Sequence, residues 1–142
     1  MSPIETARAC AAIMWDGDAA SRAMGMRIDA IGPGTAVISM DLAPEHLNGH
    51  GTAHGGILFT LADSAFAFAC NSYGAKVVAQ SAQIAFLSPG KGGERVTATA
   101  RETALAGRSG VYDVTVTGED GRRIAEFRGM SRQVPGNHLE GA

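Results

Sequence analysis

The chain has 142 residues, of which 45% are hydrophobic and 18% are charged, and its formal net charge at pH 7 is −2. These values predict one globular domain, residues 1–142, with its own hydrophobic core. They exclude the basic surface that nucleic acids require, and the longest apolar run, residues 57–70, is too short to span a bilayer. We therefore expect no nucleic acid and no membrane among its partners.

Two features favour a cytoplasmic location. The N-terminal residues MSPIETARAC lack the basic region and apolar core of a secretory signal. Cys10 and Cys70 lie far apart in the sequence, which favours two reduced, space-filling thiols over a disulfide.

The N-terminal segment, residues 1–24, is predicted to be helical. Apolar residues recur at helical spacing from Ile4 to about Trp15, and Asp16–Gly17 closes this first helix. The residues of its apolar face are Ile4, Ala7, Ala11 and Met14. Asp18 has the side chain of an N-cap for a short second helix, Ala19–Met24, which Gly25 ends.

The next segment predicts two strands and a loop. Met26–Ile31 and Thr35–Leu42 are β-like and are joined by Gly32–Pro33–Gly34, a turn sequence. Ala43–Ala53 is rich in Pro, Gly, Asn and His, so we expect it to be a loop that leads into the next element.

The stretch His54–Asn71 predicts a helix that is buried on nearly all sides, because almost every side chain from 57 to 70 is apolar or small. Asp63 is its one full charge, and a buried carboxylate is costly unless something compensates it. Gly55 and Gly56 place small residues and unpaired backbone N–H groups at the helix start, where a developing negative charge is stabilised.

Four more strands are predicted after this helix, without another helix between them. They are Lys76–Leu87, Arg95–Leu105, Arg108–Thr117 and Arg123–Val134, and residues Pro135 to Ala142 are expected to form a disordered tail. This order predicts an α+β fold in which a curved antiparallel β-sheet wraps around one long central α-helix.

The chain resembles the hotdog-fold acyl-CoA thioesterases, and within them the phenylacetic acid degradation (PaaI-like) family. Three tracts carry the resemblance: HLNGHGTAHGGILFTLADSAFAFACNS (46–72), SAQIAFLSPGKGGE (81–94) and IAEFRGMSR (124–132). The resemblance implies a hotdog fold that hydrolyses phenylacetyl-CoA or hydroxyphenylacetyl-CoA type thioesters to the carboxylic acid and free coenzyme A. It also implies no cofactor, and a homodimer that assembles into a homotetramer.

Thioester hydrolysis needs a hydrogen-bond donor for the carbonyl oxygen and a carboxylate that activates water or attacks directly. The backbone N–H of Gly55 would be the donor, and Asp63 would be the general base or the nucleophile. Each residue has a structural alternative. Gly55 could serve only to let the start of the helix pack closely against a strand, and Asp63 could be a hydrogen-bonded carboxylate without a catalytic role. Eight residues of helix rise by about 12 Å, so the two cannot meet at one carbonyl unless a second, antiparallel copy supplies one of them.

Three further residues are candidates for the catalytic site. Asn48 could bind the water or the thioester, or could form an Asn-Gly turn. His54 could assist the leaving thiolate or anchor its loop. Ser81 matches by position a serine that orients water in related thioesterases, although most serines in strands have no such role.

By resemblance, Ser88–Gly93 and Gly107–Tyr112 contact coenzyme A. The individual candidates are Ser88, Pro89, Gly90, Lys91, Gly92, Arg108, Ser109 and Gly110. The phosphates of coenzyme A would be bound by Lys91 and Arg108, together with Arg128 or Arg132. Alternatively, these charged side chains are only solvated groups at strand ends. Phe66, with Phe59 and Phe68, would line the acyl tunnel or belong to the core.

Other functions remain as alternatives. A hotdog enoyl-CoA hydratase or dehydratase usually pairs a histidine with a carboxylate, whereas the nearest histidine here, His54, precedes the helix. A non-catalytic acyl-CoA-binding module would bind without turnover. His46, His50 and His54 are spaced by four, but the glycines between them argue against a metal site, and we expect none.

Overall fold

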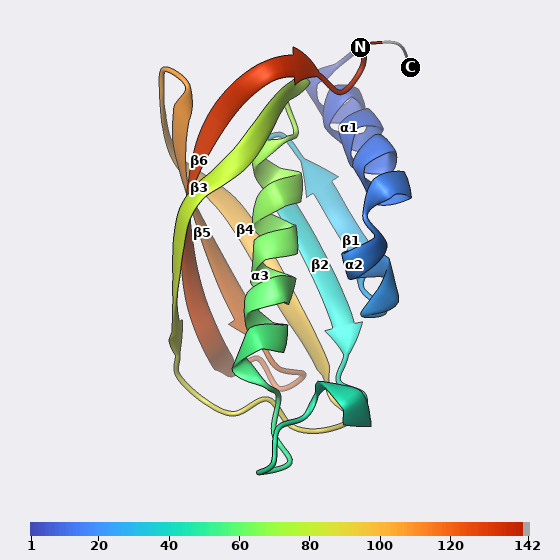
Figure 1. Cartoon of the computed structure of the whole chain (residues 1–142), viewed down its shortest axis with the longest axis vertical. Helices are drawn as coiled ribbons and strands as arrows, with labels where there is room; N and C mark the ends of the chain where they lie inside the picture. The colour runs from blue at the N-terminus through green and yellow to red at the C-terminus, as the bar shows by residue number, and fades with distance from the viewer. Residues whose placement is uncertain (141–142) are drawn as a thin grey trace.

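The computed structural model describes residues 1–140 (Figure 1). Ten elements follow one another along the chain. They are α1 (Pro3–Gly17), α2 (Ala19–Ala23), β1 (Arg27–Gly32), β2 (Thr35–Asp41), the 3-10 helix η1 (Pro44–His46), α3 (Gly55–Cys70), β3 (Ala75–Phe86), β4 (Arg95–Ala106), β5 (Ser109–Thr117) and β6 (Arg123–Asn137).

The six strands form one antiparallel sheet in the order β1-β2-β4-β5-β6-β3. The sheet curves around α3, and α1 and α2 lie beside α3 over the β1–β2 side (Figure 1). The predicted architecture, a curved antiparallel sheet around one long helix with an N-terminal helical segment, is confirmed. None of the helices in residues 1–140 is long and apolar enough to cross a membrane.

Local sequence explains where the first two helices begin. The Ser2 hydroxyl accepts the N–H of Glu5 at 3.2 Å, and the Glu5 carboxylate accepts the N–H of Ser2, which together form a capping box. Asp18 accepts the N–H of Ser21 at 3.0 Å, so the predicted N-cap of α2 is confirmed. Ile4, by contrast, is 42% exposed and takes no part in the buried face of α1.

One side of α3 forms the centre of the core, and the other side is open. The buried side includes Leu61, Ala65 and Phe68, none more than 1% exposed. The opposite stripe is not covered by the sheet, and its residues are Gly56, Thr60, Asp63 and Ala67. The helix is therefore buried on three sides rather than on all sides, and its one carboxylate lies on the open stripe.

The two edges of the sheet differ in their surroundings. α1 packs against β1, the strand at one edge. β3, at the other edge, is hydrogen-bonded to β6 only, and nine of its 12 residues are exposed while none is buried. Val78 is 49% exposed and Phe86 is 54% exposed. A long, partly apolar edge strand of this kind has unpaired backbone groups that can pair with another chain.

The expected disordered tail from Pro135 is wrong for residues 135–140. β6 continues to Asn137, which is the register partner of Ala75. His138 Nε2 lies 2.7 Å from Asn71 Oδ1, just after the end of α3. This pairing across 67 positions has no local sequence signal. Residues 141 and 142 lie outside the described residues.

Candidate active site

The N-terminal end of α3 offers a free backbone donor. His54 is the N-cap, and its Nδ1 accepts the N–H of Gly56 at 2.9 Å. The N–H of Gly55, the first residue of the helix, has no hydrogen-bond acceptor within residues 1–140. The structure therefore gives His54 an anchoring role and leaves the Gly55 N–H available at the positive end of the helix dipole.

The Gly55 backbone lines a surface cavity of about 410 Å³. Five of the predicted site residues meet there: Asn48, Gly55, Ser88, Pro89 and Gly90. A Cβ atom on Gly55 would lie 3.1 Å from the ring of Phe86, so a side chain at this position would crowd the cavity wall. The sequence predicts that Asn48 and Gly55 share one site with residues 88–90, and this cavity is consistent with that prediction.

Asn48 has one group fixed and one group free. Its Oδ1 accepts the N–H of His50 at 2.9 Å and the N–H of Thr52 at 3.2 Å, as in an Asx turn. Its side-chain amide has no acceptor within residues 1–140. Asn48 can therefore form the turn and also donate a hydrogen bond to a ligand in the cavity.

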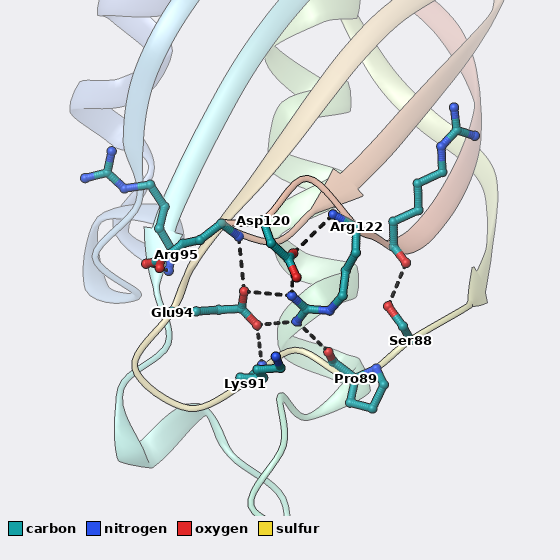
Figure 2. A network of polar contacts seen from close by, with 9 residues as sticks. Ser88, Pro89, Lys91, Glu94, Arg95, Asp120 and Arg122 are labelled. Atoms are coloured by element: carbon teal, nitrogen blue, oxygen red, sulfur yellow. Dashed lines mark hydrogen bonds and ion pairs between the residues drawn. The ribbon is translucent and has the colours of Figure 1, made fainter.

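A polar network fixes the loop that forms the far wall of this cavity (Figure 2). Glu94, which is 8% exposed, forms an ion pair with Arg122 and accepts the N–H of Lys91 at 2.5 Å and of Glu119 at 3.1 Å. Arg122 also donates to the carbonyl oxygen of Pro89 at 2.8 Å. The loop of residues 88–92 is thus attached to the turn between β5 and β6.

Electrostatics keep Glu94 ionised despite its burial. Burial raises the pKa of Glu94, but the hydrogen bonds from Arg122, Lys91 and Glu119 outweigh burial, and its pKa lies below the usual range. Gly90, in the same loop, accepts the N–H of Ala53 at 2.9 Å. The network therefore connects to the residue that precedes His54 and the start of α3.

Sequence reasoning missed Glu94 and Arg122 as functional candidates. They are separated by 28 positions, and neither belongs to a pattern that predicts the other. The only local signal was a glutamate directly after the glycine-rich loop.

Asp63 lies half-buried on the open stripe of α3. No side chain or N–H within residues 1–140 pairs with its carboxylate; the Thr60 hydroxyl bonds to the Gly56 carbonyl oxygen instead. Burial, and then the nearby charge of Asp18, raise the pKa of Asp63. A carboxylate with a raised pKa and no cationic partner is suited to accept a proton.

One chain does not bring Asp63 and Gly55 together. They are eight residues apart on the same helix, about 12 Å along its axis, and Asp63 does not line the Gly55 cavity. In the folded chain, as the sequence predicts, the two groups lie too far apart to meet at one carbonyl.

The remaining predicted residues gather in a second region. Ser81, Ser109 and Gly110 line a cavity of about 280 Å³, and Arg108 and Ser109 line a neighbouring cavity of about 180 Å³. Residues 107–110 follow β4, whereas residues 88–92 precede it. A strand of 12 residues is about 40 Å long. Within one subunit, the two segments predicted to contact coenzyme A therefore lie at opposite ends of β4.

Some predicted residues have other roles. Phe66 is 1% exposed and packs against Tyr112 and Phe127, so it belongs to the core rather than to a tunnel wall. Arg128 forms two hydrogen bonds to Asp113, at 2.7 and 2.9 Å, on the outer face of the sheet. Lys91 and Gly92 lie in the loop held by Glu94, and Arg132 donates to Ser109.

The histidine spacing does not produce a metal site in the part of the chain that the structure describes. Residues 1–140 contain no cluster of three or more His, Cys, Asp or Glu side chains that could hold an ion. His46 Nδ1 accepts the N–H of Ala43 at 2.9 Å, and His54 Nδ1 accepts that of Gly56.

Thioesterases are among the known proteins that are similar to this chain in sequence and fold. A model of the thioesterase superfamily matches residues 50–125, and the chain belongs to this superfamily. The acyl-coenzyme A thioesterase PaaI of Escherichia coli K12 is 42% identical over 123 residues, which are 87% of this chain and 88% of that protein. The predicted family is confirmed.

Solved structures agree with this assignment. The E. coli PaaI protein from the phenylacetic acid degradation operon superposes with a TM-score of 0.94 at 40% identity, over 96% of this chain and 99% of that one. A Streptococcus mutans protein bound to acetyl-CoA superposes with a TM-score of 0.76 at 25% identity, over 79% and 90% of the two chains. The fold is the hotdog fold of these thioesterases.

Proposed function

We propose that the protein is an acyl-CoA thioesterase that hydrolyses phenylacetyl-CoA or hydroxyphenylacetyl-CoA type thioesters. One observation carries the proposal: α3 holds an unpaired N–H at Gly55, in a cavity wall, and an unpaired carboxylate at Asp63. The name of the E. coli relative supports the substrate class. Both cysteines are free thiols, which supports a reaction in the cytoplasm.

The proposed chemistry uses water as the only co-reactant. The Gly55 N–H donates to the thioester oxygen, and Asp63 takes a proton from a water whose oxygen attacks the carbonyl carbon. The tetrahedral intermediate collapses, the C–S bond breaks, and the coenzyme A thiolate leaves and takes up the proton that Asp63 had accepted from the water. The products are the carboxylic acid and free coenzyme A, so no cofactor is needed. Ser81 and the Asn48 amide are proposed to bind the water and the thioester.

The open edge of β3 supports a homodimer as the minimal active unit. β3 is an open edge that a second β3 can pair with, antiparallel about a two-fold axis. This pairing would set the two α3 helices antiparallel, with Gly55 of each subunit near Asp63 of the other. It would also bring residues 88–92 of one subunit toward residues 107–110 of the other. Assembly of two dimers into a homotetramer stays a prediction from the resemblance.

Mixed dimers test the shared site. Asp63→Asn removes the base, and Gly55→Pro removes the N–H at a helix position that tolerates proline. Each variant alone should lose nearly all thiol release from phenylacetyl-CoA. When the two are co-expressed and purified by two different tags, each mixed dimer should regain one intact site and about half of wild-type activity.

Gly55→Ala is the matched control for the proline variant, because it adds a Cβ near Phe86 but keeps the N–H. It should retain more activity than Gly55→Pro. Mixed dimers as inactive as their parents would overturn the shared site. Hydration of an enoyl-CoA without thiol release would favour the hydratase, and tight binding of phenylacetyl-CoA without turnover would favour the binding module.

A further inference from the structure

Three polar side chains connect the short helix α2 to α3 beside the proposed base. The Ser21 hydroxyl donates to Asp18 Oδ2 at 2.6 Å, and the Oγ atoms of Ser21 and Ser64 lie 2.7 Å apart. Both serines are buried, and 43 positions separate them in the sequence. Ser64 directly follows Asp63 in α3. This serine chain (Asp18, Ser21 and Ser64) therefore runs from the N-cap of α2 to the residue next to the base.

The direction of the hydrogen bonds in the serine chain follows from the groups it contains. A serine hydroxyl has one proton to donate. Because Ser21 gives its proton to the Asp18 carboxylate, the Ser64 hydroxyl must be the donor to Ser21. The Thr60 hydroxyl, three residues before Asp63, likewise donates to a carbonyl oxygen of its own helix at 2.8 Å. Both neighbouring hydroxyls are thus engaged, and neither gives Asp63 the hydrogen bond that would lower its pKa.

Asp18 also brings a second negative charge to the base. Burial is the main cause of the raised pKa of Asp63, and the charge of Asp18 is the next. Within residues 1–140 it is the one charged side chain that shifts this pKa. The N-cap of α2 therefore acts on the base through space as well as through the serine chain.

The other elements packed on α3 bring no opposite charge to Asp63 within the described part of the chain. In α2, Arg22 is exposed and donates to a carbonyl oxygen of its own helix cap at 3.4 Å. In β1, Arg27 forms an ion pair with Asp41 at 3.2 Å. The charged residues of α1 are all exposed. The strand side chains in the core around α3 are apolar except for Tyr112, whose ring contacts a phenylalanine of that helix.

We propose that Asp18 is a positioning residue for the base: the serine chain orients the Asp63 face of α3, and the Asp18 carboxylate keeps a negative charge beside that face. The inference rests on the proposed function. The N-terminal segment contributes no residue to the Gly55 cavity, yet it would help to set the pH range of hydrolysis. Repulsion between the two carboxylates makes ionised Asp63 the stronger base.

Asp18→Asn tests the charge and keeps the cap, since asparagine caps helices about as well as aspartate. The readout is thiol release from phenylacetyl-CoA across the pH range. The acidic limb of kcat/KM should move about 0.3 to 1 pH unit lower, the range expected for the loss of one nearby charge. Asp16→Asn is the matched control, because it removes the same charge from an exposed position two residues away. It should leave the limb in place.

Ser64→Ala tests the serine chain while the Asp18 charge stays. It should lower kcat about threefold to tenfold, because the base is less well oriented. KM and the acidic limb should stay nearly unchanged. Ser39→Ala is the matched control, since Ser39 is also a buried serine but lies in β2, outside the chain, and this variant should keep the wild-type kcat.

Nuclear magnetic resonance titration of the Asp63 carboxyl carbon reads the charge effect without substrate, with Asp63→Asn to identify the signal. Its midpoint should be lower in Asp18→Asn than in the wild type. Equal midpoints, or the same shift in Asp16→Asn, would overturn the role of Asp18. An unchanged kcat in Ser64→Ala would overturn the role of the serine chain. No thiol release by the wild type from any thioester would instead overturn the proposed function, whatever the titration shows.

Discussion

At the residue scale, the open stripe of α3 explains why a charged side chain is present in the most apolar segment of the chain. Asp63 is desolvated enough to have a raised pKa, yet no partner neutralises it. A group of this kind lowers the stability of the fold while it increases the basicity of the carboxylate. The same residue is thus expected to affect activity and stability in opposite directions.

Asp63→Asn should lower kcat for phenylacetyl-CoA at least about 100-fold, because a positioned general base contributes that much or more. It should also raise Tm at neutral pH. The raised pKa means that ionised Asp63 destabilises the folded state, with the full effect above the folded pKa and none below the ordinary value of 3.8.

The gain in Tm should therefore disappear as the pH falls below about 3.8. Thermal unfolding of the two proteins across this pH range measures it. Equal Tm values at pH 7 would contradict the raised pKa, and retention of more than about a tenth of the activity would contradict the base.

At the scale of elements, the loop of residues 88–92 depends on two charged side chains from other parts of the chain. Its short sequence has several glycines and no secondary structure of its own. The Glu94–Arg122 pair and the bond from Arg122 to the Pro89 carbonyl oxygen hold it against the turn between β5 and β6 (Figure 2). The wall of the Gly55 cavity is therefore positioned by residues that do not line it.

Arg122→Ala should raise KM for acyl-CoA about tenfold with a smaller change in kcat, because the loop of residues 88–92, which we propose binds coenzyme A, loses its position. It should also lower Tm by several degrees, since Glu94 is left buried without its partner. Arg123→Ala is the control: the side chain of this neighbour is 69% exposed, and its one ion pair within residues 1–140 is with Glu126.

Glu94→Gln tests the charge of the pair separately. The lowered pKa of Glu94 means that its ionised form stabilises the fold above the ordinary value of 4.5, and that this contribution is lost as the pH falls through the lower, folded pKa. The Tm difference from wild type should shrink accordingly in acid. Steady-state kinetics that are alike for Arg122→Ala and Arg123→Ala would contradict the positioning role.

At the scale of the whole molecule, the two edges of the sheet are expected to differ in their ability to pair with a second chain. β1 is covered by α1, whereas β3 has an exposed edge with apolar side chains. Gln80 is the residue of β3 that is skipped in the register with β6, and a bulge in an edge strand is a position at which a sheet tolerates proline.

Gln80→Pro should therefore leave the fold of one chain intact and weaken pairing between two β3 edges. We expect a dimer or larger assembly for the wild type and a shift toward monomer, with loss of thioesterase activity, for the variant. Asp29→Pro is the matched control, because Asp29 is the skipped residue of β1 at the other edge. Analytical ultracentrifugation with parallel assays would decide, and a fully active monomer would contradict the shared site.

The sequence by itself determined the elements and the class of fold. Apolar periodicity, glycine turns and side-chain caps act over a few residues, so α3, the Asp18 cap and the six strands could be predicted within a few positions. The HGG motif and Asp63 likewise belong to one short segment, which is why the candidate chemistry could be located before the structure was known.

Only the tertiary structure decided which residues are free and which are engaged. It shows the N–H of Gly55 without an acceptor, Phe66 in the core, Arg128 paired with Asp113, and the end of β6 attached to α3 through His138. It also brought Glu94 to Arg122. These properties depend on contacts between residues far apart in the chain, and local sequence patterns carry no information about such contacts.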